Sequence, residues 1–143
     1  MEISIHDNRL LSYCVSGEAR EIRLHTIYDD REPNEYTDVV FSGVVAYFFE
    51  QDNFGTIIFD VHETDVAKLY AAQKMQFEIG RKYCWPGAWN TSEQATLSHL
   101  VSYGTKAFEL CSSIGMNGWV LAQSMSIIAI NGPKVPTTIE AIQ

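Results

Sequence analysis

The chain has 143 residues, 46% of them hydrophobic, and a formal net charge of −8, which is typical of one globular domain that buries its core without disulfides. The acidic balance argues against nucleic acid as a ligand, because phosphate binding depends on clustered Lys and Arg. The three cysteines are odd in number and lack the paired spacing of a zinc site, and no apolar run approaches the ~20 residues of a membrane span. We therefore expect a cytoplasmic protein with reduced thiols, no metal site and no membrane contact.

The first third of the chain is predicted to form strands. Apolar and polar residues alternate over 11–15 and 22–28, and the Ser-Gly-Glu-Ala turn between these runs predicts a hairpin. A polar stretch follows at 29–38, in which Pro33 and Asn34 interrupt any regular element. We interpret this stretch as a loop that leads into the next strand.

The stretch 37–61, TDVVFSGVVAYFFEQDNFGTIIFDV, predicts two strands joined by a turn at QDNFG, where Gly55 is free to adopt a positive φ. Residues 39–49 are apolar at nearly every position, which predicts a central strand that is covered on both faces. The apolar pattern resumes at 57–61. The first four strands are thus expected to form an antiparallel meander.

Beyond residue 61 the apolar period changes from two to about 3.6, which predicts a helix. This helix is expected to begin at Thr64 or Asp65 and to end at Gly80. A second helix is predicted to begin near 90–92 and to end before Gly104.

The last third returns to strands, with alternation at 108–112, the hairpin dipeptide Asn117-Gly118 and a return strand at 119–130. The predicted fold class is α+β, with a mainly antiparallel sheet of about six strands and two helices on one face. Its elements follow the order four strands, two helices, two strands. Residues 1–130 are predicted to form a single domain, and 131–143 a C-terminal tail.

Acidic residues form the first candidate binding site. In an up-and-down meander, the loop at 29–38 and the exit of the fourth strand at 62–65 lie at the same end of the sheet. Seven carboxylates are then expected to share one edge: Asp29, Asp30, Glu32, Glu35, Asp38, Glu63 and Asp65. Such an edge attracts a basic protein partner. The alternative is a solvated loop in an acidic protein.

The loop YCWPGAW at 83–89 is the second candidate, because Trp and Tyr are enriched at binding hot spots. Trp85 and Trp89 are its candidate anchors. The alternative is that both side chains fill the gap between the two predicted helices.

Catalytic residues are not expected. His62 has Asp60 and Glu63 nearby, but on a strand Asp60 and His62 point one way and Glu63 the other, and the spacing matches no metal motif. Neither a G-x-S-x-G nucleophile motif nor a Gly-rich phosphate loop is present. We therefore expect a protein that is not an enzyme and that carries no cofactor.

The segments TDVVFSGVVAYFFEQDNFGTIIFDVHE at 37–63 and FELCSSIGMNGWVLAQSMSI at 108–127, with a helix that ends before YCWP, resemble small bacterial proteins of the immunity type. Those proteins are cytosolic antidotes to polymorphic or contact-dependent toxins. The resemblance is one of pattern over about 10–128 and carries no functional residue onto this chain. It implies a protein that binds a cognate toxin domain, such as a basic nuclease, and blocks its active site or substrate access. A small-molecule-binding module and an assembly subunit that exposes the apolar face of 119–130 are the alternatives.

Overall fold

The computed structural model describes residues 3–132, which form eight strands and three short α-helices. The strands are β1 (Arg9–Ser16), β2 (Glu21–Tyr28), β3 (Glu35–Ser42), β4 (Ala46–Glu50), β5 (Ile57–Thr64), β6 (Lys106–Ile114), β7 (Asn117–Ala122) and β8 (Ser124–Ile130). Between β5 and β6 lie α1 (Val66–Ala72), α2 (Lys74–Gly80), the 3-10 turn η1 (Arg81–Tyr83) and α3 (Glu93–Ser102). Within residues 3–132, every helix is too short or too polar to cross a membrane.

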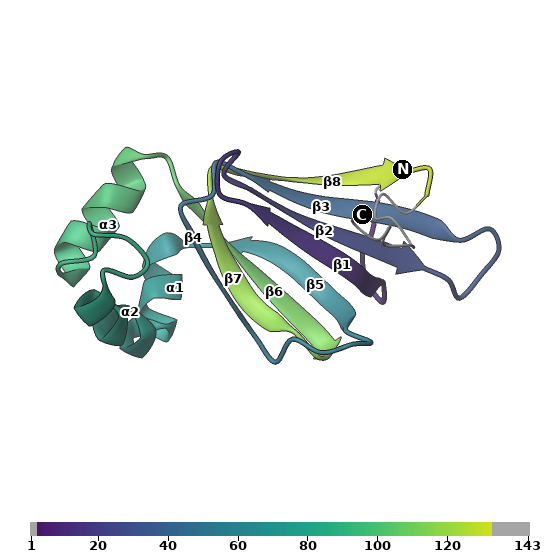
Figure 1. The fold of residues 1–143 in the computed structure, drawn as a ribbon, viewed down its shortest axis with the longest axis horizontal. Helices are drawn as coiled ribbons and strands as arrows, with labels where there is room; N and C mark the ends of the chain where they lie inside the picture. Colours follow the sequence, from purple (N-terminus) through teal and green to yellow (C-terminus); the bar gives the residue numbers. More distant parts are fainter. Residues whose placement is uncertain (1–2, 133–143) are drawn as a thin grey trace, which may run out of the picture.

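The strands follow the order β4-β7-β6-β5-β1-β2-β3-β8, and each neighbouring pair is antiparallel. Figure 1 shows that this sheet folds into two layers, β4-β7-β6-β5 and β1-β2-β3-β8, which diverge from the end where the helices lie. A single register pair, Arg9 with Ile57, joins β1 to β5.

The chain passes from one layer to the other at a sharp bend. β4 is the first strand of the order and β3 the last but one, although only residues 43–45 separate them in the sequence. Gly43 has φ +65°, and a Cβ added to it would lie 2.6 Å from the side-chain oxygen of Gln123. A glycine is therefore needed at this bend, because an L side chain is both strained and obstructed there. Gln123 marks the matching bend between β7 and β8.

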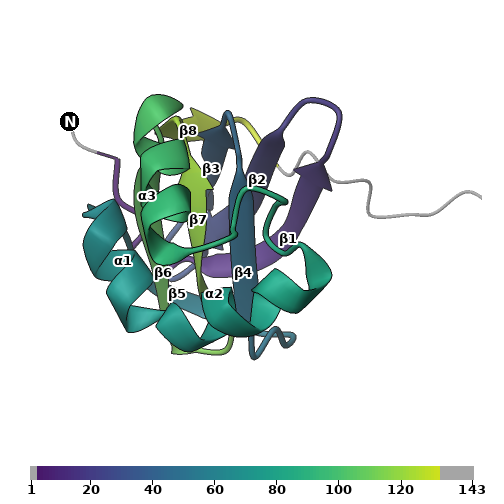
Figure 2. The same ribbon diagram turned by 90° about the vertical axis from the view of Figure 1, so that its left-hand side faces the viewer.

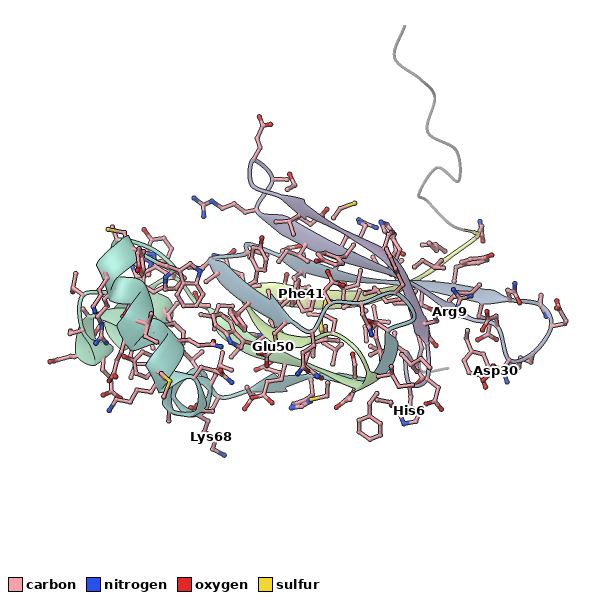
Figure 3. All side chains as sticks on the ribbon, turned by 60° about the horizontal axis from the view of Figure 1, so that its bottom comes forward. His6, Arg9, Asp30, Phe41, Glu50 and Lys68 are labelled. Atoms are coloured by element: carbon pink, nitrogen blue, oxygen red, sulfur yellow. The ribbon has the colours of Figure 1, made fainter. Side chains whose placement is uncertain are left out.

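Two apolar clusters form the core, one between the two strand layers and one between the sheet and the helices. Between the two strand layers, Phe41 of β3 meets Phe108 of β6 with ring centroids 5.7 Å apart, and Figure 3 shows Phe41 inside the sandwich. The second cluster lies on the outer face of β4, β7 and β6, which the helices cover in Figure 2. Val120 belongs to the first cluster and Trp119 to the second, so β7 is buried on both faces.

The helices begin at side-chain caps. The Asp65 carboxylate accepts the backbone N–H of Lys68 at 3.1 Å and so caps α1, and Ser92 caps α3 through the N–H of Ala95 at 3.1 Å. The helix predicted over 65–80 is interrupted, because Gln73 has φ −110° and belongs to neither α1 nor α2.

The predicted sheet of about six strands with two helices on one face is wrong, because the structure is mostly an eight-stranded antiparallel sheet with three short helices. The strand predicted at 39–49 is split at Gly43, and its second half does not pair with β5 but with β7. The return strand predicted at 119–130 is likewise split at Gln123. Of the predicted tail at 131–143, residues 133–143 lie outside the part of the chain that the structure describes.

Candidate functional site

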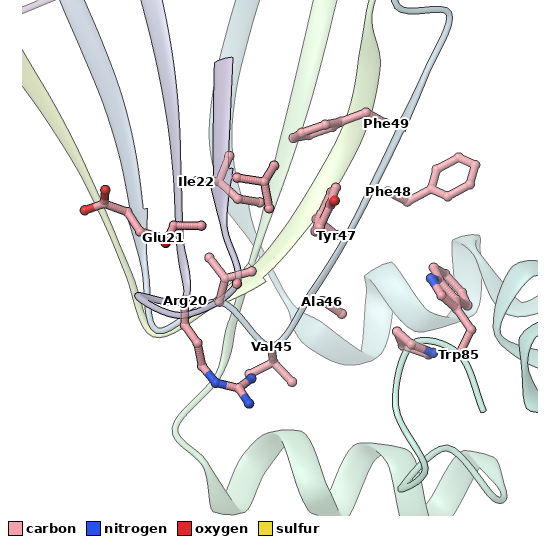
Figure 4. A pocket seen from close by; sticks show the side chains of 14 residues that line it. Arg20, Glu21, Ile22, Val45, Ala46, Tyr47, Phe48, Phe49 and Trp85 are labelled. Atoms are coloured by element: carbon pink, nitrogen blue, oxygen red, sulfur yellow. The ribbon is translucent and has the colours of Figure 1, made fainter. Parts of the chain in front are cut away.

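An open groove separates β4 from the tip of the β1-β2 hairpin. Its volume is about 540 Å³, and most of the residues that line it are apolar, although polar atoms contribute much of the exposed lining. Among the described residues, the charged side chains of the lining are those of Arg20 and Glu21. Figure 4 shows Tyr47 and Phe49 pointing from β4 toward Ile22 in the other layer, whereas Phe48 points to the opposite side, on which Trp85 lies. The groove thus has aromatic side chains along one wall and a hairpin along the other.

The strand that lines one wall of the groove, β4, has an open edge. β4 stands at one end of the strand order and, within residues 3–132, pairs only with β7, so the backbone groups on its other side are left out of the sheet formed by these residues. An extended peptide can add to such an edge by main-chain hydrogen bonding, with neighbouring pockets selecting its side chains.

Trp85 is fixed in the groove by close packing. Its ring lies 5.9 Å from both Phe77 and Trp119 and 6.3 Å from Phe48, measured between centroids. A Cβ on Gly80 would lie 2.4 Å from the Trp85 ring, so the indole can approach the backbone of α2 only because this position is a glycine. Trp85 is therefore held by the second apolar cluster while part of its surface faces the groove.

A buried asparagine holds the loop that carries Trp85. The Asn90 side-chain amide donates to the carbonyl oxygens of Phe77 at 2.7 Å and Trp85 at 3.0 Å. Its Oδ1 accepts from the Thr96 hydroxyl at 2.7 Å and from Arg81 Nε at 3.3 Å. Asn90 thus uses both its donor hydrogens and its acceptor oxygen to connect α2, the loop and α3.

A second apolar hollow lies behind Phe48 and Trp85. It has a volume of about 420 Å³, and Ile79 and Tyr83 line it with side chains that are 56% and 77% exposed. Exposed apolar surface that is continuous across two hollows is typical of a contact site for another macromolecule.

Tyr13 of β1 connects the two layers and contacts Phe49, one of the residues that line the groove. Its hydroxyl donates to Asp52 in the β4-β5 loop at 2.6 Å, and its ring lies 5.5 Å from that of Phe49. The hydrogen bond to the Asp52 carboxylate, with a further contribution from burial, raises the pKa of Tyr13 to about 12. The tyrosine therefore stays neutral, and donates, across the physiological pH range.

The acidic residues predicted to share one edge do not do so. In Figure 1 the β2-β3 loop with Asp29 to Glu35 lies at the end far from the helices, whereas Glu63 and Asp65 lie where β5 enters α1. The labels of Asp30 and Lys68 at opposite ends of Figure 3 show the same separation. The bend at Gly43 causes this difference, because it reverses the direction of the chain once more than a meander of four strands does.

Several of these carboxylates already have partners. Asp29 accepts from Arg9 at 2.7 Å, which lowers the pKa of that carboxyl, and Glu35 accepts from Arg31 at 2.9 Å. Asp65 is the cap of α1. Among the described residues, the predicted acids that are exposed and make no salt bridge or side-chain hydrogen bond are Asp30, Glu32 and Glu63.

Asp38 is fully buried on the outer face of the β1-β2-β3-β8 layer. Its two carboxylate oxygens lie 3.0 Å from Arg23 Nη1 and 3.1 Å from His25 Nδ1. Ser12 is the cross-strand partner of His25, so serine, histidine and aspartate stand in a row across three strands. The Ser12 hydroxyl is buried, however, and makes no hydrogen bond within residues 3–132, so it is neither accessible nor activated as a nucleophile.

Trp89, predicted as a binding anchor, does not line either hollow. Its ring stacks on His99 with a centroid distance of 4.6 Å, and it packs against the second apolar cluster. The two tryptophans predicted together therefore differ in their surroundings, since Trp85 lines the groove and Trp89 lies against α3.

The other titratable cluster lies on β5 and β6. His62 Nδ1 is 2.9 Å from Asp60 and its Nε2 is 3.3 Å from Glu109, with all three side chains partly exposed. Burial raises the pKa of the neighbouring Cys111 thiol, and Glu109 and Asp60 raise it further. The part of the chain from 3 to 132 has no group of three His, Cys, Asp or Glu side chains arranged to hold a metal ion.

The hairpin tip at 16–21 and the aromatic residues of β4 were not predicted as site residues. Tyr47, Phe48 and Phe49 were expected to be core residues of a central strand, and the signal that points to the site is the glycine that interrupts this apolar run at position 43. The chain matches no protein-family model, no curated protein and no solved structure.

Proposed function

We propose that this protein binds a cognate bacterial toxin domain and neutralises it, with the groove beside β4 as the contact surface. The observation that supports this proposal best is the aromatic groove of about 540 Å³ that runs along an unpaired strand edge. The segment inserted there is an extended peptide of the toxin whose apolar side chains contact Tyr47 and Trp85. The resemblance to immunity-type proteins supplies the class of partner.

The net charge of −8 favours a basic partner. Toxin domains that cut nucleic acid tend to be basic because their substrate is anionic, and an acidic inhibitor attracts such a domain at long range. Asp30 and Glu32, which are exposed at the end of the molecule far from the helices, contribute to this attraction without lining the groove. We therefore expect charge to govern the association rate and the groove to govern the dissociation rate.

The test uses the toxin domain encoded in the reading frame beside this gene. Calorimetry measures its affinity, and surface-immobilised binding measures the two rates. Tyr47→Ala is expected to raise the dissociation rate about tenfold, because Tyr47 is 39% exposed in the groove wall. The matched control is Phe54→Ala, an aromatic truncation at a fully exposed position in the β4-β5 loop, which leaves both rates unchanged.

The contribution of charge is tested by a variant that combines Asp30→Lys with Glu32→Lys. This variant is expected to associate more slowly with the toxin domain, and its association rate is expected to depend less on salt. The proposal fails if no neighbouring frame encodes a toxin domain, or if that domain does not bind. The groove is excluded as the contact surface if Tyr47→Ala and Phe54→Ala give the same dissociation rate.

A further inference from the structure

The sheet has two free edges, and they differ in how well they are protected. β4 is a strand of five residues that ends in Glu50, and the β1-β2 hairpin tip lies across the groove from it. β8 has seven residues, Ser-Met-Ser-Ile-Ile-Ala-Ile, and within residues 3–132 it pairs only with β3. Natural proteins protect exposed edges with short strands, charges, prolines or bulges. β8 has none of the first three, and its register with β3 is regular over all seven residues.

β8 itself and the described residues on either side of it in the sequence carry no charged side chain. No Asp, Glu, Lys or Arg occurs from Trp119 to Gly132, although the chain has eighteen acidic residues. Asp38, which is the register partner of Ile128 on β3, is buried and bonded to Arg23 and His25. Because two copies of a protein with charge −8 repel one another, a neutral surface of this kind favours a contact between copies over a charged one.

The residues of β8 are complementary in size to those of a second, antiparallel β8. A two-fold axis through Ile127 places Ser126 opposite Ile128 of the other copy, and Met125 opposite Ala129. In these pairs a large side chain faces a small one, and Ile127 on the axis faces Ile127 of the other copy. Met125 and Ile127 are only partly buried at the margin of the apolar cluster between the two strand layers, and Ile128 is 41% exposed, so a second strand would cover all three.

We propose that two copies of this protein associate through antiparallel pairing of their β8 strands. The contact is isologous, and it joins the two β1-β2-β3-β8 layers into one continuous sheet. It leaves the groove free, because no residue of β8 lines the groove. The proposal is thus independent of the toxin-binding function.

The salt dependence of this association has a defined sign. Because the two copies carry like charges, screening reduces their repulsion and the dimer tightens as salt rises from ~0.05 to ~0.5 M. Binding of a basic partner weakens over the same range. A titration with salt that follows the dissociation constant therefore distinguishes the contact between two copies from the contact with a basic partner.

The experiment is sedimentation equilibrium of the full chain over a concentration series, with Ser126→Glu and Ile128→Glu combined in one variant. These two exposed positions meet across the proposed axis, so the added carboxylates oppose each other and the dissociation constant is expected to rise at least about tenfold. The control combines Ser98→Glu with Val101→Glu on α3, which adds the same charge at exposed positions. Circular dichroism verifies that both variants remain folded.

Hydrogen exchange gives a second measurement. Amides of 124–130 are expected to become protected as the wild-type concentration rises, while those of β4 do not change. A wild-type chain that stays monomeric up to ~1 mM overturns the proposal. So does a dimer that the two double variants weaken equally, because the contact then lies elsewhere.

Discussion

Replacing Asn90 with Ala is expected to release the Trp85 loop and to destabilise the protein substantially. The Asn90 side chain is 3% exposed and makes short hydrogen bonds to the carbonyls of Phe77 and Trp85 and from the Thr96 hydroxyl. Alanine leaves these three groups without their partner; the bonds to the Phe77 carbonyl and from Thr96 are buried, and the bond to the Trp85 carbonyl is partly buried. The longer bond from Arg81, at 3.3 Å, contributes little, and Arg81 keeps its bond of 2.6 Å to the Tyr70 hydroxyl.

The expected loss in the free energy of unfolding is about 3 kcal/mol, taking about 1 kcal/mol for each of the three short hydrogen bonds. For a urea dependence of about 2 kcal/mol per molar, the unfolding midpoint falls by about 1.5 M. Urea titration followed by circular dichroism and by tryptophan emission measures this shift. Emission is informative because Trp85 is expected to become more exposed in the folded variant.

The matched control is Thr91→Ala, which truncates the next residue at an exposed position and is expected to change stability by less than about 0.5 kcal/mol. A loss below about 1 kcal/mol for Asn90→Ala would refute the reasoning, because the three buried groups would then have found other partners. Unchanged emission from the folded variant would show that Asn90 does not position Trp85.

Three further outcomes are expected. The pKa of Tyr13 is raised from 10.0 to about 12 in the folded state. Its contribution to stability is therefore complete below pH 10 and is lost as the pH rises to about 12. Urea titration of Tyr13→Phe and of the wild type across this pH range measures the loss. Cys111 is expected to react with a disulfide reagent more slowly than the two exposed cysteines, because burial raises its pKa; three equal rates would contradict this. Gly80→Ala is expected to cost about 1 to 3 kcal/mol because the added Cβ meets the Trp85 ring, while Gly17→Ala, with no atom within 4 Å, is expected to be neutral in the same thermal unfolding assay.

Local elements could be predicted wherever the sequence pattern has one structural meaning. The alternation over 11–15 and 22–28 predicted the β1-β2 hairpin, which is confirmed. The start of α1 near Asp65 and the end of α3 before Gly104 were also predictable, because a capping carboxylate and a glycine act within one turn of the helix.

The pairing of the strands could not be predicted in this way. The QDNFG turn indicates a hairpin between 39–49 and 57–61, but β4 pairs with β7 and β5 pairs with β6 and β1. Register pairs such as Phe48 with Trp119 join residues far apart in sequence, and their contribution depends on burial that no local pattern contains. The partner of Asp29 could not be predicted for the same reason, because Arg9 reaches this carboxylate only through the pairing of β1 with β2.

The bend at Gly43 connects the error in the fold to the error in the site. A continuous strand over 39–49 would have placed Tyr47 and Phe49 in the centre of a sheet, covered on both faces. The bend moves β4 to the end of the strand order, so the same aromatic residues line a groove beside an unpaired edge. Apolar character predicts that a side chain contacts other apolar groups, but it does not specify whether those groups belong to the same chain. An apolar run interrupted by a glycine with positive φ is therefore a reason to search for a contact surface at the second half of the run.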